Sequence, residues 1–136
     1  MAGYYWAVVG YHRGHRCGYV RIPPGHALNG KRYDDVPYMD VHGGLTLSRT
    51  GDSDTIWKMC NFPAGGTVYG FDCNHDMDLP DPELMPGYDR NKHIAEILME
   101  KDLREGEIRT ADYVESECRG LILELDKYKE SEHDAK

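Results

Sequence analysis

Three short segments of the sequence are rich in side chains that can bind a ligand or transfer a proton. Residues 12–16 contain two His and two Arg, residues 42–44 read His-Gly-Gly, and residues 72–78 read Asp-Cys-Asn-His-Asp-Met-Asp. Each segment follows an apolar run, and loops at the ends of rigid strands often carry binding and catalytic groups. We expect the three segments to meet at one end of a sheet.

A pocket for a small anionic, nucleotide-like ligand uses most of these side chains. Arg and His can pair with phosphates, and carboxylates can accept hydrogen bonds from ribose hydroxyls. Glycines let the main chain approach a ligand closely. The residues that we expect to line this pocket are His15, Arg16, His42, Gly43, Gly44, Asp72, His75 and Asp78.

A small hydrolase without a metal is an alternative interpretation. His42 or His75 would act as general acid or base, oriented by Asp72 or Asp76. Cys73 would be a nucleophile only if a neighbouring histidine lowered its pKa. A buried cysteine at a strand end is more often part of the packing, so the sequence favours binding over catalysis.

A metal ion is a further alternative, although we expect no cofactor. Zinc prefers the ligand types that are supplied by His12, His15, Cys17, Cys73 and His75. Their spacings, His-x-x-His-x-Cys and Cys-x-His, match no common paired-ligand pattern. The carboxylates of the third segment suit a hard cation, but the glycine of a calcium loop is missing. The ligands of a metal here would be His75, Asp72 and Asp78.

The elements that must position these groups are strands followed by helices. Runs of β-branched and aromatic residues bounded by Gly and Pro predict the strands. Pro37 makes one of them an edge or irregular strand. The strands are predicted at residues 4–9, 18–22, 36–41, 45–48, 55–59 and 67–71, and the helices at 93–103 and from Thr110 onward.

The last helix has the clearest pattern. Thr110 is a typical N-cap, and Asp112 in the first turn suits the helix dipole. An apolar stripe with steps of four and three residues then predicts a face packed on the sheet, or else a helix–helix seam in a homo-oligomer. The stripe consists of Val114, Cys118, Leu121, Leu125 and Tyr128.

These elements predict an α+β protein with a mostly antiparallel sheet and two C-terminal helices packed on one face. The 136 residues are most simply one domain, with a sheet and loop-rich part at 1–82 and a helical part at 92–130.

Charge and composition narrow the classes of partner that the protein can bind. The net charge is −8, and residues 1–33 carry five Lys/Arg and no Asp or Glu, whereas all 24 acids follow. An acidic protein is a poor match for long nucleic acid, which is bound by phosphate neutralisation. No apolar run approaches the roughly 20 residues that a membrane span needs. Four cysteines without a Cys-x-x-Cys pair, and no sign of an export signal, predict reduced thiols in the cytoplasm.

Several motifs together resemble a family of small phage and prophage proteins, most of them without an assigned activity. The motifs are Gly-His-x-Cys-Gly-Tyr-Val at 14–20, Pro-Pro-Gly-His at 23–26, Tyr-Asp at 33–34, Val-His-Gly-Gly-Leu-Thr at 41–46, Gly-Phe-Asp-Cys-x-His-x-x-Asp at 70–78 and Tyr-Val-x-x-Glu-Cys at 113–118. The resemblance implies a place in the host cell cytoplasm during infection. By analogy with small phage proteins that counter host defence, it implies a protein that sequesters a nucleotide-derived immune signal, or a phosphodiesterase that degrades one. A protein that inhibits a host protein through its acidic helices is the third class.

Overall fold

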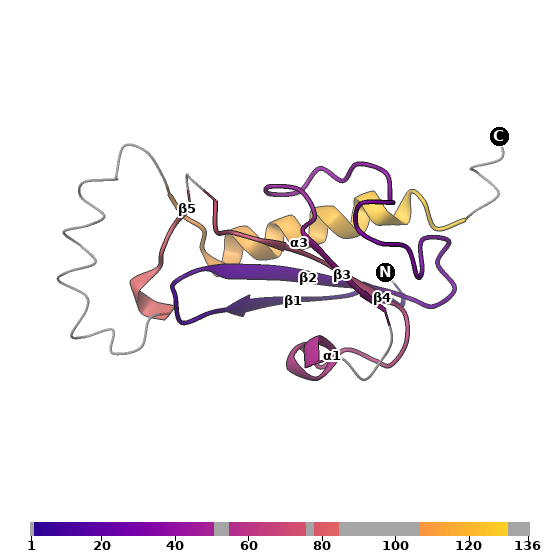
Figure 1. The fold of residues 1–136 in the computed structure, drawn as a ribbon, viewed down its shortest axis with the longest axis horizontal. Coiled ribbons are helices and arrows are strands. Elements are labelled where there is room, and N and C mark those ends of the chain that lie inside the picture. Colours follow the sequence, from indigo (N-terminus) through magenta and orange to yellow (C-terminus); the bar gives the residue numbers. More distant parts are fainter. Residues whose placement is uncertain (1, 51–54, 76–77, 85–106, 131–136) are drawn as a thin grey trace.

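A computed structural model describes the chain except residues 1, 51–54, 76–77, 85–106 and 131–136. Its centre is a four-stranded antiparallel sheet with the strand order β1-β2-β4-β3 (Figure 1). The strands are β1 (Tyr5–Gly10), β2 (Arg16–Ile22), β3 (Leu47–Thr50) and β4 (Thr67–Asp72). The predicted α+β class and antiparallel sheet are therefore confirmed.

The two central strands, β2 and β4, form the most buried part of the sheet because both faces are covered. Tyr19 of β2 lies opposite Gly70 of β4. A Cβ atom at Gly70 would lie 2.9 Å from the Tyr19 ring, so the glycine gives that ring its place on the strand. Gly70 is thus required by close packing, although a glycine weakens a strand in general.

Helix α3 (Ala111–Asp126) covers one face of the sheet, above it in Figure 1. Thr110 is its N-cap, because the hydroxyl oxygen accepts a hydrogen bond from the Tyr113 N–H at 3.2 Å. The predicted stripe is buried against the sheet, so it is not available as a helix–helix seam. Its members Val114, Cys118, Leu121 and Leu125 are fully buried, and Tyr128 is partly buried.

The opposite face carries a short helix, α1 (Thr55–Cys60), where we predicted a strand at 55–59. The prediction was wrong because Ile56 and Trp57 are adjacent and both buried on this side of the sheet. Consecutive residues of a strand point to opposite faces, whereas consecutive residues of a helix can share one buried side. Asn61 ends the helix in a left-handed conformation, with φ of 56°.

The segment 36–41 is also different from the prediction, because it forms a loop and not a strand. The Val41 N–H donates to the Met39 carbonyl at 3.0 Å, a bond that turns the backbone within three residues. Met39 and Val41 are still buried, so their apolar side chains serve the core from a loop.

Two short strands, β5 (Asp78–Leu79) and β6 (Glu107–Ile108), pair in parallel beside the sheet, and a 3-10 turn, η1 (Pro82–Leu84), follows β5. The helix predicted at 93–103 lies outside the described residues, as does the first part of the predicted helical region 92–130. In the described part of the chain, no helix combines the length and the apolar character needed to cross a bilayer.

Candidate functional site

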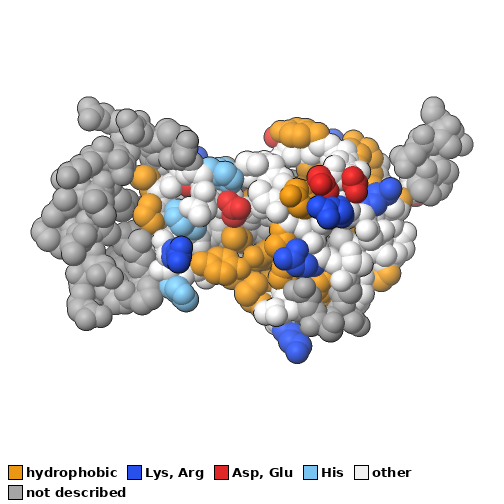
Figure 2. All heavy atoms as spheres, in the orientation of Figure 1, with side chains coloured by type: hydrophobic (Ala, Val, Ile, Leu, Met, Phe, Trp, Pro, Cys, Tyr) orange, Lys and Arg blue, Asp and Glu red, His pale blue; other side chains and the backbone are white. Residues whose placement is uncertain are grey.

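The sheet brings two of the three polar segments to one end of the molecule, and the third, residues 42–44, reaches them from a loop that α3 holds. In the antiparallel pair of β2 and β4, Cys17 lies opposite Asp72, so β2 begins where β4 ends. The Cys73 N–H extends the ladder with a bond to the Arg16 carbonyl at 2.9 Å. Figure 2 shows histidine side chains, in pale blue, beside hydrophobic ones, in orange, on the left of this face. We call the end of the molecule where these polar segments meet the β5 end.

The centre of the β5 end is the carboxylate of Asp78, whose side chain is 1% exposed. Its Oδ2 lies 2.9 Å from His42 Nε2 and 3.1 Å from His75 Nδ1, and it accepts from the His75 backbone N–H at 3.0 Å. Its Oδ1 accepts from Arg109 Nε at 2.8 Å. We call His42, His75 and Asp78 the histidine cluster.

Helix α3 holds His42 at two points. The Tyr113 hydroxyl lies 2.8 Å from His42 Nδ1, and Glu117 accepts from the His42 backbone N–H at 2.7 Å. Tyr113 and Glu117 are four residues apart, so they lie on one side of the helix. The first two turns of α3 thereby orient the imidazole of His42 toward Asp78.

His75 lies between two carboxylates and is the accessible member of the histidine cluster, with a side chain 40% exposed. Its Nδ1 faces Asp78, and its Nε2 lies 3.4 Å from Oδ1 of Asp72. The ring centroids of His42 and His75 are 5.5 Å apart. A Cβ atom on Gly43 would lie 2.5 Å from the His75 ring, so Gly43 provides the space that this ring occupies.

The charge of Asp78 is maintained by its hydrogen bonds. Burial alone would raise the pKa of this carboxyl, but the bonds from Arg109, His42 and His75 outweigh burial and hold the pKa at about 2. The same bond to Asp78 raises the pKa of Arg109 above its usual value. At neutral pH, the histidine cluster therefore has a fixed negative charge on Asp78, which is paired with a fixed positive charge on Arg109.

Cys73 does not have the environment of a nucleophile. Its side chain is 1% exposed, and burial raises the pKa of its thiol to about 12. A thiol in that state gives almost no thiolate at neutral pH. The structure therefore argues against covalent catalysis by Cys73.

Two other predicted residues have different partners. Arg16 donates to Asp81 at 2.8 Å and to the Arg109 carbonyl at 3.1 Å, and the side chains of Arg16 and Asp81 are each 11% exposed. Arg16 therefore joins β2 to the segment after β5. His15 Nδ1 lies 2.9 Å from the Cys73 carbonyl oxygen and supports the loop that carries His75.

Gly44 does not share the position of Gly43. A Cβ atom on Gly44 would meet nothing within 4 Å, and Gly44 lines a separate cavity of about 290 Å³. Asp76, which we named as an alternative orienting carboxylate, lies outside the described residues.

A shallow groove of about 200 Å³ adjoins the histidine cluster on the α1 side of the sheet. Asp72 connects the groove to the histidine cluster, because it lines the groove and contacts His75. Thr46 donates to the other oxygen of Asp72 at 3.3 Å. The groove is lined by Cys17, Tyr19, Thr46, Leu47, Gly70, Phe71 and Asp72.

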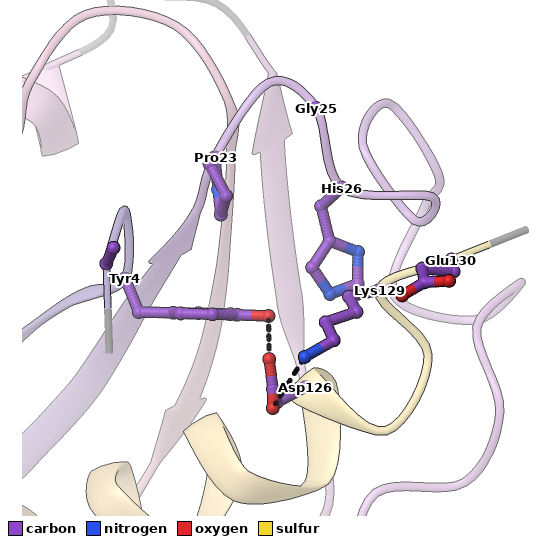
Figure 3. A pocket seen from close by; sticks show the side chains of 8 residues that line it. Tyr4, Pro23, Gly25, His26, Asp126, Lys129 and Glu130 are labelled. Atoms are coloured by element: carbon purple, nitrogen blue, oxygen red, sulfur yellow. Dashed lines mark hydrogen bonds and ion pairs between the residues drawn. The ribbon is translucent and has the colours of Figure 1, made fainter.

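The larger cavity, of about 460 Å³, lies at the opposite end of the sheet, where β2 and α3 both end (Figure 3). Its polar groups contact one another: Tyr4 donates to Asp126 at 2.9 Å, and Lys129 lies 3.6 Å from the same carboxylate. We did not predict this cavity from the sequence, because its walls come from two segments far apart in the chain, residues 2–26 and 126–130.

Three residues of the β5 end were absent from the predicted site: Arg109, Tyr113 and Glu117. Tyr113 and Glu117 carry a signal, since both belong to the motif at 113–118 and follow each other on one side of a helix. Arg109 has no such signal, because it is a single arginine before the N-cap.

No family model, no curated protein and no solved structure matches this chain.

Proposed function

We propose that the protein binds and sequesters a small anionic, nucleotide-like ligand at the β5 end. The observation that carries this proposal is the position of Asp72, which joins an aromatic-lined groove to the accessible imidazole of His75. A nucleotide has the same two parts, a flat ring next to hydroxyl and phosphate groups. A few placed polar groups beside an apolar surface are the usual composition of a small-molecule site.

The groove suits the ring part of such a ligand. Tyr19 provides an aromatic wall, and its hydroxyl is fixed by the Tyr11 hydroxyl at 2.7 Å. Leu47 also lines the groove, and its side chain packs over Gly70 beside the Tyr19 ring. Asp72 is placed to accept hydrogen bonds from ribose hydroxyls at the edge of this groove.

The phosphate part would face His75 and the turn between β1 and β2. This turn lies against the segment after β5, because the Asp81 N–H donates to the Gly14 carbonyl at 2.7 Å. Arg13 in the turn is exposed and has no partner among the residues that the structure describes. An exposed guanidinium can form paired hydrogen bonds with phosphate oxygens.

Sequestration is favoured over turnover by the state of the reactive groups. The thiol of Cys73 is buried and protonated, and Asp78 is occupied by four hydrogen bonds. The resemblance to phage proteins leads us to propose a host immune signal as the ligand, and an anti-defence role in the host cytoplasm.

A phosphodiesterase is the second candidate, because one observation favours it. His75 lies between Asp72 and Asp78, and a half-exposed imidazole held by carboxylates can act as general acid or base. This candidate uses the same groove and the same ligand class, so one experiment separates it from sequestration.

The experiment is to incubate the protein with cyclic and linear nucleotides, remove unbound compounds, denature the protein and identify what is released by mass spectrometry. Sequestration predicts one intact nucleotide at close to one equivalent per binding site. Conversion of that nucleotide to product would support the phosphodiesterase. No retained nucleotide and no product would contradict both, and would favour the protein-inhibitor class.

A further inference from the structure

We propose that His42, His75 and Asp78 bind a divalent transition metal ion, with Zn²⁺ as the preferred metal. The proposal rests on the geometry of these side chains and does not require that the protein bind a nucleotide.

The three potential ligand atoms are close to the arrangement that zinc needs. They lie within 4.8 Å of one another, and Asp78 Oδ2 is 2.9 Å from His42 Nε2 and 3.1 Å from His75 Nδ1. Tetrahedral bonds of about 2.0–2.1 Å place ligand atoms roughly 3.4 Å apart. The two nitrogens therefore need to move away from the carboxylate by a few tenths of an ångström and toward each other by up to roughly 1.4 Å.

A second observation is independent of these distances: each ligand has its other polar atom held by a partner. His42 Nδ1 lies 2.8 Å from the Tyr113 hydroxyl, and His75 Nε2 lies 3.4 Å from Asp72. Protein metal sites use such partners to select the tautomer and orientation of a ligating histidine, and a carboxylate behind the histidine is a common one.

The carboxylate ligand is held in the same way. Arg109 occupies Oδ1 of Asp78 at 2.8 Å, which leaves Oδ2 directed at the two imidazoles. The side chain of Asp78 is 1% exposed, and a carboxylate that is both buried and oriented is a strong ligand for a cation. All three ligands are thus supported by side chains behind them.

The ligand set distinguishes between kinds of metal. Two imidazoles and one carboxylate suit zinc and its transition-metal neighbours. Calcium prefers six to eight oxygen ligands, and magnesium is held mainly by oxygen atoms and water. One carboxylate among two histidines therefore favours zinc over either hard cation.

The site also has an entry path and an open position. His75 is 40% exposed, so an ion can approach from the solvent side of the cluster. Three protein ligands leave the fourth position of a tetrahedral ion free, as in catalytic zinc sites. If the proposed nucleotide binds, a phosphate oxygen can occupy that position. The metal then supplies positive charge to the phosphate, because the charge of Arg109 is already paired with Asp78.

The test uses metal-free protein, prepared with a chelator, without any nucleotide. Co²⁺ is titrated while its visible absorption is recorded, and Zn²⁺ is titrated by calorimetry. The wild-type protein is expected to bind one equivalent of either metal per chain. His75→Gln removes the accessible ligand and should weaken binding by at least tenfold, whereas His12→Gln, a change in an exposed histidine of the β1–β2 turn, should leave affinity unchanged.

A further variant keeps the test decisive if His75→Gln does not fold. Asp72→Asn retains both imidazoles and the buried carboxylate but removes the partner of His75 Nε2, so affinity should fall by about tenfold, as for other supporting groups of metal ligands. Circular dichroism would establish that each variant is folded. The proposal is overturned if the wild type shows no saturable binding, or if folded His75→Gln and Asp72→Asn bind as tightly as the wild type. Because no nucleotide is present, these outcomes are independent of the nucleotide-retention result.

Discussion

At the scale of single residues, the contrast between Gly43 and Gly44 is the most informative. Both have positive φ, 68° and 78°, so either would be strained by any other residue. Only Gly43 is in contact with the histidine cluster, because a Cβ atom there would lie 2.5 Å from the ring of His75. The two glycines therefore separate the cost of backbone strain from the effect on the site.

We predict that Gly43→Ala displaces the His75 ring and weakens both Zn²⁺ and nucleotide binding by at least tenfold. Gly44→Ala should bind as the wild type does, because its new methyl group meets open space. Both variants should lose about 1–2 kcal/mol of unfolding free energy, the usual cost of a left-handed conformation. Calorimetric titration and urea denaturation of the two variants measure these quantities.

Binding as tight as the wild type's by both Gly43→Ala and Gly44→Ala would contradict this prediction. It would mean that the ring of His75 can leave its position without any consequence for a ligand. An equal loss of binding in both variants would contradict it too, since backbone strain alone would then explain the effect.

At the scale of elements, α3 connects the two ends of the molecule. Its first two turns carry Tyr113 and Glu117, which hold His42, and its last turn accepts a hydrogen bond from His26. A helix rises about 1.5 Å per residue, so Tyr113 and Asp126 are roughly 20 Å apart along it. Packing of the apolar stripe on the sheet fixes both ends at once.

His26 is held in one neutral tautomer at the end of α3. Its Nδ1 accepts from the Leu28 N–H at 3.0 Å, so its Nε2 carries the hydrogen that it donates to the Leu125 carbonyl at 2.9 Å. Burial lowers the pKa of His26 below its usual value, and the bond to Leu125 only partly opposes this. Protonation would remove the acceptor that the Leu28 N–H needs.

This arrangement predicts the direction in which the unfolding free energy changes with pH. A histidine with a lowered folded pKa contributes stability above its unfolded pKa, about 6.5, and this contribution is lost as pH falls through the folded value. We predict that His26→Gln lowers unfolding free energy by about 1–3 kcal/mol at neutral to alkaline pH, because the Leu28 N–H loses its buried acceptor. The variant should also lose less stability than the wild type on acidification.

Urea denaturation at about pH 8 and about pH 5.5 measures both effects. His12→Gln is the matched control, because His12 is exposed in the β1–β2 turn and should behave as the wild type. The wild type and the His26→Gln variant share every other ionisable group, so their comparison isolates the contribution of His26. A wild type and a His26→Gln variant that lose equal stability on acidification would disprove the role of His26.

At the scale of the whole molecule, the basic excess of the first 33 residues does not become an anion-binding face. Arg16 pairs with Asp81, Arg32 pairs with Asp34, and buried Arg21 donates to three backbone carbonyls. Arg16 and Arg21 therefore have structural roles, and Arg32 is paired with a carboxylate at the surface. In the described part of this segment, Arg13 is the cation that remains beside the β5 end.

The local pattern of apolar and polar residues predicts much of the fold and part of the site. Strands β1, β2 and β4 and the capped helix α3 each have a periodicity that tertiary contacts reinforce. Helix α1 could not be predicted, because a short run with adjacent Ile56 and Trp57 suits a strand equally well. The position of His75 beyond the end of β4 followed from a strand that ends in a polar loop, whereas His42 comes from a loop held by α3. The role of Arg109 depends on a contact across 31 residues of chain.

We place the binding site at the β5 end, although a cavity of about 460 Å³ lies at the other end of the sheet. The most direct test is to record backbone amide chemical shifts of ¹⁵N-labelled protein while adding the nucleotide that it retains. We predict shift changes at residues 42–44 and 72–75, and unchanged shifts at 25–26 and 126–130. Changes confined to 25–26 and 126–130 would contradict the proposal and would place the ligand in the opposite cavity.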